Sequence, residues 1–211
     1  MNDKGFKIGV LVAVIAMVVV VGVGFAAFTT TLNINGTAKV EASSWNIGFS
    51  TDTTAITPGE VDVFNGNTQS GITSTTTVVK KATLTDTTVN DWEVKFKTPG
   101  DYAEMNFYVL NKGSFDAKVS TYELPTPTCT GTGDNAVADA KNVCDHLEYT
   151  LVRENAGGNV PFAVGTPLPK TNGIAPLILK LTYKDDVTDA ELPKGEVTIS
   201  NLGFSIVYTQ A

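Results

Sequence analysis

The sequence predicts an all-β protein: an antiparallel, jelly-roll-like sandwich with one short helix, preceded by a signal peptide. Apolar and polar residues alternate with a period of two in many short stretches, as in strands with one buried face. Many of the 19 glycines and 9 prolines lie between these stretches. Only one stretch after the apolar N-terminus has the pattern of a helix. Many short strands with almost no helix are typical of sandwiches.

The first 26 residues have the parts of a secretory signal peptide. Lys4 and Lys7 give a positive start, and the apolar stretch from Ile8 to Val23 contains no charged residue. Small residues then place the predicted cleavage between Ala26 and Ala27, because signal peptidases accept small side chains there. Residues 1–26 are therefore expected to be removed on export.

Two other interpretations of this stretch stay open. The uncharged run from Ile8 to Phe28 is long enough for an uncleaved anchor that spans a bilayer. Lys4-Gly5-Phe6 is similar to a prepilin cleavage site, although Val10 stands where that pattern has Glu. All three interpretations place the rest of the chain outside the cytoplasm.

Composition excludes several classes of function. The chain has 15 Lys and Arg against 22 Asp and Glu, a net charge of -7, which excludes a nucleic-acid binder with a broad basic face. One His and two Cys are too few for most His-cluster zinc hydrolases and for four-cysteine zinc sites. We therefore expect no catalytic residue, no metal, no cofactor and no nucleic-acid partner.

The two cysteines, Cys129 and Cys144, predict a disulfide, because the body of the chain is expected outside the cytoplasm. Closing a loop of this size stabilises the fold by roughly 3 kcal/mol in the chain-entropy model. Two free thiols are the alternative. A metal site is a weaker one, since only His146 lies nearby in the sequence.

The longest alternation follows the predicted cleavage site. Residues 27–41 form a near-unbroken period-two pattern without Pro. The more apolar face consists of Phe28, Thr30, Leu32, Ile34, Gly36, Ala38 and Val40. One interpretation is an ordinary first strand that pairs within its own chain. Asn35-Gly36 also permits a hairpin here, since Asn-Gly favours tight turns.

Residues 42–211 are predicted to be one jelly-roll domain, because no linker long enough to divide them is present. A loop with a Pro-Gly turn is expected over residues 52–59, and the one helix over Asn135–Cys144. The expected strands are residues 45–49, Thr76–Leu84, Trp92–Lys97, Tyr102–Leu110, Lys118–Leu124, Leu147–Arg153, Leu177–Lys184 and Val197–Tyr208, the last with an irregularity at Asn201-Leu202-Gly203.

Several stretches, taken in order, resemble the TasA/camelysin family of secreted, fibre-forming matrix proteins, which is similar in plan to the archaeal bundling pilins. The N-terminal ones are Ala26-Ala27-Phe28, Gly36-Thr37-Ala38-Lys39-Val40 and Trp45-Asn46-Ile47-Gly48-Phe49. The later ones are Thr98-Pro99-Gly100-Asp101-Tyr102, the stretch from Val109 to Ala117, and the end from Leu192 to Gln210. The resemblance covers most of the chain after residue 26.

The resemblance implies a secreted jelly-roll subunit that polymerises head to tail with itself, an N-terminal strand of one subunit completing the sheet of the next. Residues 27–41 suit such a donor strand, because they are long, alternating, free of Pro and close to the predicted new N-terminus. Burying Phe28, Leu32, Ile34 and Val40 would contribute on the order of 6–12 kcal/mol before ordering costs. Other matrix or cell-surface components are possible further partners, and a membrane only through the signal segment.

Two rival functions come from other classes. The first is a monomeric surface binding module, displayed on an uncleaved membrane anchor. The second is a secreted metallohydrolase, since camelysins have been described as metalloproteases. The sequence contains no His-Glu-x-x-His motif, and its single His lies beside the predicted disulfide.

Overall fold

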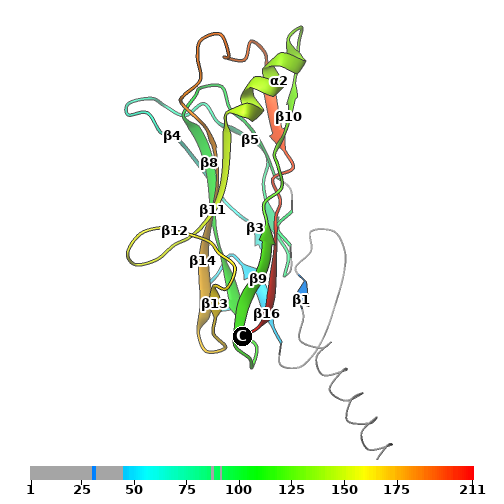
Figure 1. Cartoon of the computed structure of the whole chain (residues 1–211), viewed down its shortest axis with the longest axis vertical. Helices are drawn as coiled ribbons and strands as arrows, with labels where there is room; N and C mark the ends of the chain where they lie inside the picture. Colours follow the sequence, from blue (N-terminus) through cyan, green and yellow to red (C-terminus); the bar gives the residue numbers. More distant parts are fainter. Residues whose placement is uncertain (1–29, 32–44, 87, 91) are drawn as a thin grey trace, which may run out of the picture.

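The computed structural model describes residues 30–31, 45–86, 88–90 and 92–211, which form an elongated two-layered sandwich (Figure 1). Its strands run from β1 to β16, and every strand pairing among these residues is antiparallel. The one helix described in this part of the chain is α2 (Ala136–Asp145). The predicted fold class, an antiparallel all-β sandwich with one short helix, is confirmed.

One layer is a single sheet built around two long strands, β8 (Asp101–Asn111) and β14 (Gly173–Tyr183). Buried and half-buried residues alternate along the whole of β14, which reflects the period-two pattern of its sequence. The other strands of this sheet are β12 (Val160–Pro161) and β11 (Leu147–Arg153) beyond β14, and β2 (Ile47–Ser50) and β4 (Val63–Asn67), which both pair with β8.

The second layer consists of two four-stranded sheets that follow each other end to end. The first has the order β1 (Thr30–Thr31), β16 (Ser205–Gln210), β9 (Ala117–Glu123), β13 (Pro167–Leu168). The second has the order β10 (Thr128–Gly131), β15 (Val197–Ser200), β7 (Glu93–Lys95), β5 (Thr77–Lys80). A small separate sheet pairs β3 (Gly59–Glu60) with β6 (Thr83–Leu84).

The second layer is divided because two neighbouring strands are interrupted close together. β9 is separated from β10 by Pro125 and Pro127, and Pro cannot donate a ladder hydrogen bond. β15 is separated from β16 by residues 201–204, and Asn201 has a φ of +60°. Asn201 Nδ2 donates to Thr126 O across the gap at 2.8 Å, so the two interruptions hold each other in place.

The core lies between the layers. Phe49 of β2 and Phe107 of β8 meet Phe204, which precedes β16, with ring centroids 5.6–5.9 Å apart. All three rings are fully buried, and tilted or edge-on contacts of this kind add to the hydrophobic term. The contact joins the two layers close to the start of β16.

Several predicted elements differ from those observed. The predicted strand Thr76–Leu84 is two strands, β5 and β6, and β14 begins at Gly173 rather than Leu177. Pro176 lies inside β14, opposite Tyr108, although Pro normally argues against a central strand. Five observed strands, β3, β4, β10, β12 and β13, have no counterpart among the predicted ones, and Gly59 of β3 lies in the predicted loop. In β4 the sequence Asn65-Gly66 is typical of a turn, and its pairing with β8 overrides that local signal.

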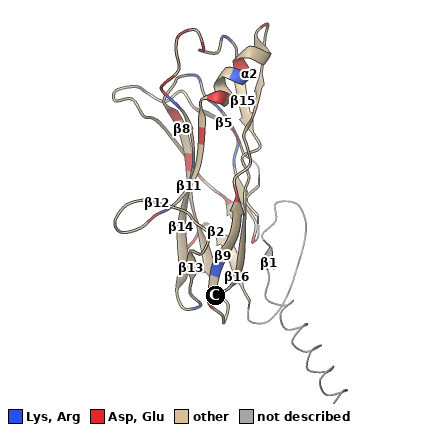
Figure 2. Ribbon diagram, in the orientation of Figure 1, with Lys and Arg blue, Asp and Glu red and all other residues tan. Residues whose placement is uncertain are grey.

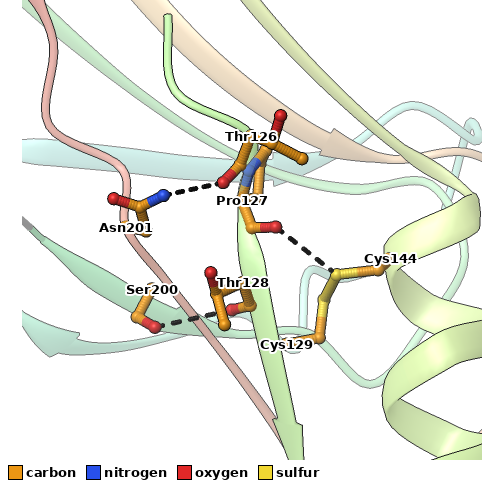
Figure 3. The surroundings of a disulfide bond; sticks show 7 residues. All are labelled: Thr126, Pro127, Thr128, Cys129, Cys144, Ser200 and Asn201. Carbon is orange, nitrogen blue, oxygen red and sulfur yellow. Dashed lines mark hydrogen bonds between the residues drawn. A yellow bond between two sulfur atoms is a disulfide. The ribbon is translucent and has the colours of Figure 1, made fainter.

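The predicted disulfide is confirmed. Cys129 of β10 is bonded to Cys144 of α2, with Cα atoms 5.9 Å apart (Figure 3). Cys144 Sγ also lies 3.8 Å from Pro127 O, which is a contact only, because a disulfide sulfur carries no proton. The bond attaches α2 to the second layer, beside the interruption between β9 and β10.

Replacing both cysteines, Cys129→Ser with Cys144→Ser, should lower the melting temperature, because a loss of about 3 kcal/mol is expected when the closed loop is opened. Thermal denaturation in oxidising buffer measures the effect. Wild-type protein in reductant is the matched control and should melt close to the variant. A variant that melts like the oxidised wild type would contradict the stabilising role.

Candidate assembly site

β16 is a strand with neighbours on both sides, and one of them comes from the start of the chain. All six residues of β16 pair with β9. On the opposite side β1 pairs with it, Thr30 opposite Tyr208 and Thr31 opposite Val207. We call the β1-facing side of Ser205–Gln210 the β16 rim. The described residues near the N-terminus therefore join the sheet at its edge, beside the C-terminal strand (Figure 1).

The two faces of β16 differ in burial. Ile206 and Tyr208 are fully buried between the layers, whereas Ser205, Val207 and Thr209 are half-buried on the outer face. Opposite residues of an antiparallel pair share one face of the sheet. In this register Thr30 lies opposite Tyr208, a residue of the buried face of β16.

Tyr208 adds a buried polar group to this face. Its hydroxyl has no hydrogen-bond partner among the described residues. Burial raises the pKa of Tyr208 well above the ordinary value, and the positive charge of Arg153 opposes this rise only weakly. The ring thus contributes apolar contact area, while its hydroxyl adds little stability.

The rim has a defined end. β15 precedes β16 in the chain and pairs with β7. The isolated pair Val89–Phe204 continues the register of that pairing toward β16. Trp92 Nε1 also donates to Leu202 O at 2.9 Å, so this buried carbonyl is already satisfied. The chain around residues 89–95 therefore lines the run as far as Phe204, and β1 lies further along the same side.

Of the predicted donor-strand residues, the structure describes one. Thr30 lies in β1, within residues 27–41, and it pairs with β16 of its own chain. Six others, and both residues of the predicted cleavage site, lie outside the described residues: Phe28, Leu32, Ile34, Gly36, Ala38, Val40, Ala26 and Ala27. Residues 1–26 lie outside them too. No helix within the described part of the chain is long and apolar enough to cross a membrane.

The Pro-Gly-Asp stretch that contributes to the family resemblance holds loops rather than a ligand. Asp101 is fully buried and accepts hydrogen bonds from Thr75 Oγ1 at 2.5 Å and from Asn67 Nδ2 at 3.0 Å. Gly100 has a φ of +88°, a conformation that favours glycine. Together they attach the connection between β4 and β5 to the start of β8.

Asn111 has the same role at the other end of β8. Its Nδ2 donates to Phe115 O and to Leu168 O, each at 2.9 Å, and its Oδ1 accepts from Gly113 N. Asp116 Oδ1 accepts from Lys170 N, which holds the loop after β13. Asp101, Asn111 and Asp116, three of the residues that carry the resemblance, therefore hold loops at or near the ends of β8.

The only histidine of the chain lies just after α2. His146 Nδ1 is 3.0 Å from Asp186 Oδ1, and its Nε2 is 3.7 Å from Glu191 Oε1. Hydrogen bonds from Thr188, through its hydroxyl and its amide, lower the pKa of Glu191. In the described ranges, no group of three or more His, Cys, Asp or Glu is placed to hold a metal ion. These contacts tie the helix to the loop before β15.

Sequence reasoning predicts an N-terminal strand, of which the structure describes only Thr30–Thr31, and it does not single out the β16 rim. The stretch Ser205–Gln210 contains no charged residue and no Pro, although edge strands usually carry such residues to prevent pairing with other chains. That absence was the available signal. The absence of charged residues and Pro cannot be interpreted from the sequence alone, because nothing in the sequence indicates that this strand lies at an edge.

Tyr208→Phe should change the stability by less than about 1 kcal/mol at pH 7, because the lost hydroxyl has no partner in the described structure. Above about pH 10 the unfolded wild type loses the Tyr208 proton while the folded protein keeps it, so the free energy of unfolding falls as the pH rises. The variant should lose less stability between pH 7 and pH 11. Urea denaturation at both pH values measures this.

Tyr122→Phe is the matched control at pH 7, because the Tyr122 hydroxyl donates to Phe162 O at 2.8 Å. This variant should be destabilised by about 1 kcal/mol. Equal losses in the two variants at pH 7 would show that the Tyr208 hydroxyl is satisfied.

Comparisons with protein-family models, with curated proteins and with solved structures found no match to this chain.

Proposed function

We propose that this protein is a secreted structural subunit that polymerises with itself, without covalent links, into extracellular fibres of a biofilm matrix or a pilus-like surface structure. Each subunit donates its N-terminal strand, within residues 27–41, to the sheet of the next. The supporting observation is the pairing of β1 with β16, since a segment near the predicted new N-terminus adds to an edge of the sandwich.

Edge pairing of this kind can be exchanged between copies. A strand that adds to its own sheet through backbone hydrogen bonds makes the same bonds to the same sheet of another copy. The two surfaces in contact, an N-terminal strand and a sheet edge, differ from each other. Such a heterologous contact produces an open filament when the rotation between copies does not close into a ring.

The strength of the contact follows from the residues. The even-numbered face of the donor strand carries Phe28, Leu32 and Ile34, and the buried face of β16 carries Ile206 and Tyr208. Burial of the three donor side chains, on the order of 5–9 kcal/mol before ordering costs, with about 1 kcal/mol for each main-chain bond, is enough for a stable polymer. The net charge of -7 would keep free subunits soluble before assembly.

The pairing of β1 within its own chain favours a second candidate function. A subunit whose edge is permanently filled by its own N-terminal segment would stay monomeric. It would then act as a surface binding module, held at the membrane if the predicted signal segment remains attached.

Electron microscopy of the secreted protein, beside a truncation that begins at Ser43, tests the proposal. We expect fibres from the first and only monomers from the second, because the truncation lacks the donor strand. Circular dichroism should show that the truncated body remains β-rich. Monomers from both proteins would favour the monomeric module instead.

Leu32→Asp provides a point-mutant test with a neighbouring control. An aspartate on the core face of the donor strand would bury an unpaired charge, so this variant should form no fibres. Asn33→Asp adds the same charge on the opposite face and should still form fibres. Fibres of normal length from Leu32→Asp, by electron microscopy, would contradict donation of this strand.

A further inference from the structure

We propose that the accepting edge of the second copy is the β16 rim, and that it pairs with residues 28–33 only, not with the whole of 27–41. This inference rests on the proposed function and specifies its contact. The occupant is the N-terminal segment of another copy of this chain.

The position and register follow from the strand that is already there. β1 places Thr30 opposite Tyr208 and Thr31 opposite Val207. Continued over the six residues of the rim, this register sets residue 28 opposite Gln210 and residue 33 opposite Ser205. Leu32 then falls opposite Ile206, which is fully buried on the core face.

The length follows from the chain that lies beside the preceding residues. In the same register Ile34 would fall opposite Phe204, but Phe204 already pairs with Val89 on that side. Val89 is fully buried. Two residues before Phe204, Leu202 O accepts a hydrogen bond from Trp92 Nε1. Donor residues from Ile34 onward therefore have no free edge to pair with in this register, and they would connect neighbouring subunits.

The other edge strands carry features that oppose strand addition. β12 and β13 contain Pro161 and Pro167, and β5 ends at Lys80, next to Lys81. β10 is bonded to α2 by the disulfide.

Two strands beside β8 remain to be compared with β16. Phe49 N of β2 donates to Asp86 O, so that strand already has a neighbour. β4 carries no such feature and is the competing edge, with Phe64 55% exposed. The β16 rim contains no charged residue (Figure 2) and no Pro, and it is the edge beside which the N-terminal segment lies.

Cysteine crosslinking between two single variants tests the position of the contact. Secreted protein with Thr31→Cys is mixed with Val207→Cys protein and oxidised, so that a bond between these two positions requires two copies. Opposite residues of antiparallel strands lie within the Cα range of a disulfide. On a non-reducing gel we expect more dimer from the mixture than either variant gives when it is oxidised alone. Thr31→Cys mixed with Asn65→Cys, on β4, is the control and should give no more dimer than its two components give alone.

Two further pairs test the length of the contact. Asn33→Cys with Ser205→Cys should crosslink, since Ser205 belongs to the rim and residue 33 falls opposite it in this register. Asn35→Cys with Gly203→Cys should not, since Val89 occupies the neighbouring position. Equal crosslinking of both pairs would overturn the six-residue limit. Because Gly203→Cys protein can fail to fold, Val40→Asp provides an independent check: it should keep its fibres, and their loss would also overturn the limit.

The outcomes separate the two proposals. Fibres without a Thr31–Val207 dimer, or with a Thr31–Asn65 dimer, would leave the fibre function standing and refute the β16 rim as the accepting edge. If the wild type stays monomeric and a Thr31→Cys, Val207→Cys double variant crosslinks only within one chain, the register is correct and the fibre function fails.

Discussion

The second layer of the sandwich depends on one strand run, residues 197–210, which has different neighbours along its two halves. On one side β10 pairs with its first half and β9 with its second. On the other side, pairing with the chain around residues 89–95 stops at Phe204. The remaining six residues, Ser205–Gln210, would be an unpaired edge without β1. Because an unpaired edge exposes a row of backbone donors and acceptors, the pairing of β1 with Val207 and Tyr208 covers groups that would otherwise be free to pair.

The sequence predicted those parts of the fold in which the local pattern and the tertiary structure agree. The alternation at Leu147–Arg153 gave the bounds of β11, and the irregularity at residues 201–203 gave the interruption between β15 and β16. The disulfide was predicted from the expected compartment. Where long-range pairing overrides a local signal, as in β4 with its Asn-Gly and β14 with its Pro, prediction failed.

The candidate site shows the same limit. A donor strand can be predicted from sequence, because its length and alternation are local properties. The edge that accepts it cannot, because an edge is defined by which strands lie beside it. Asp101 and Asn111 illustrate the reverse case: both were noticed as parts of a family resemblance, and the structure gives them loop-holding roles at the two ends of β8.

Helix α2 and the β16 rim lie at opposite ends of the long axis of the molecule (Figure 1). The helix is held there by the disulfide and by Asp139, which accepts hydrogen bonds from Gly195 N and Lys194 N. Its Val137 is 87% exposed. A fluorophore or an epitope attached at this position would therefore be rigidly oriented and remote from the rim, and could report the orientation of each subunit by polarised microscopy without obstructing the edge.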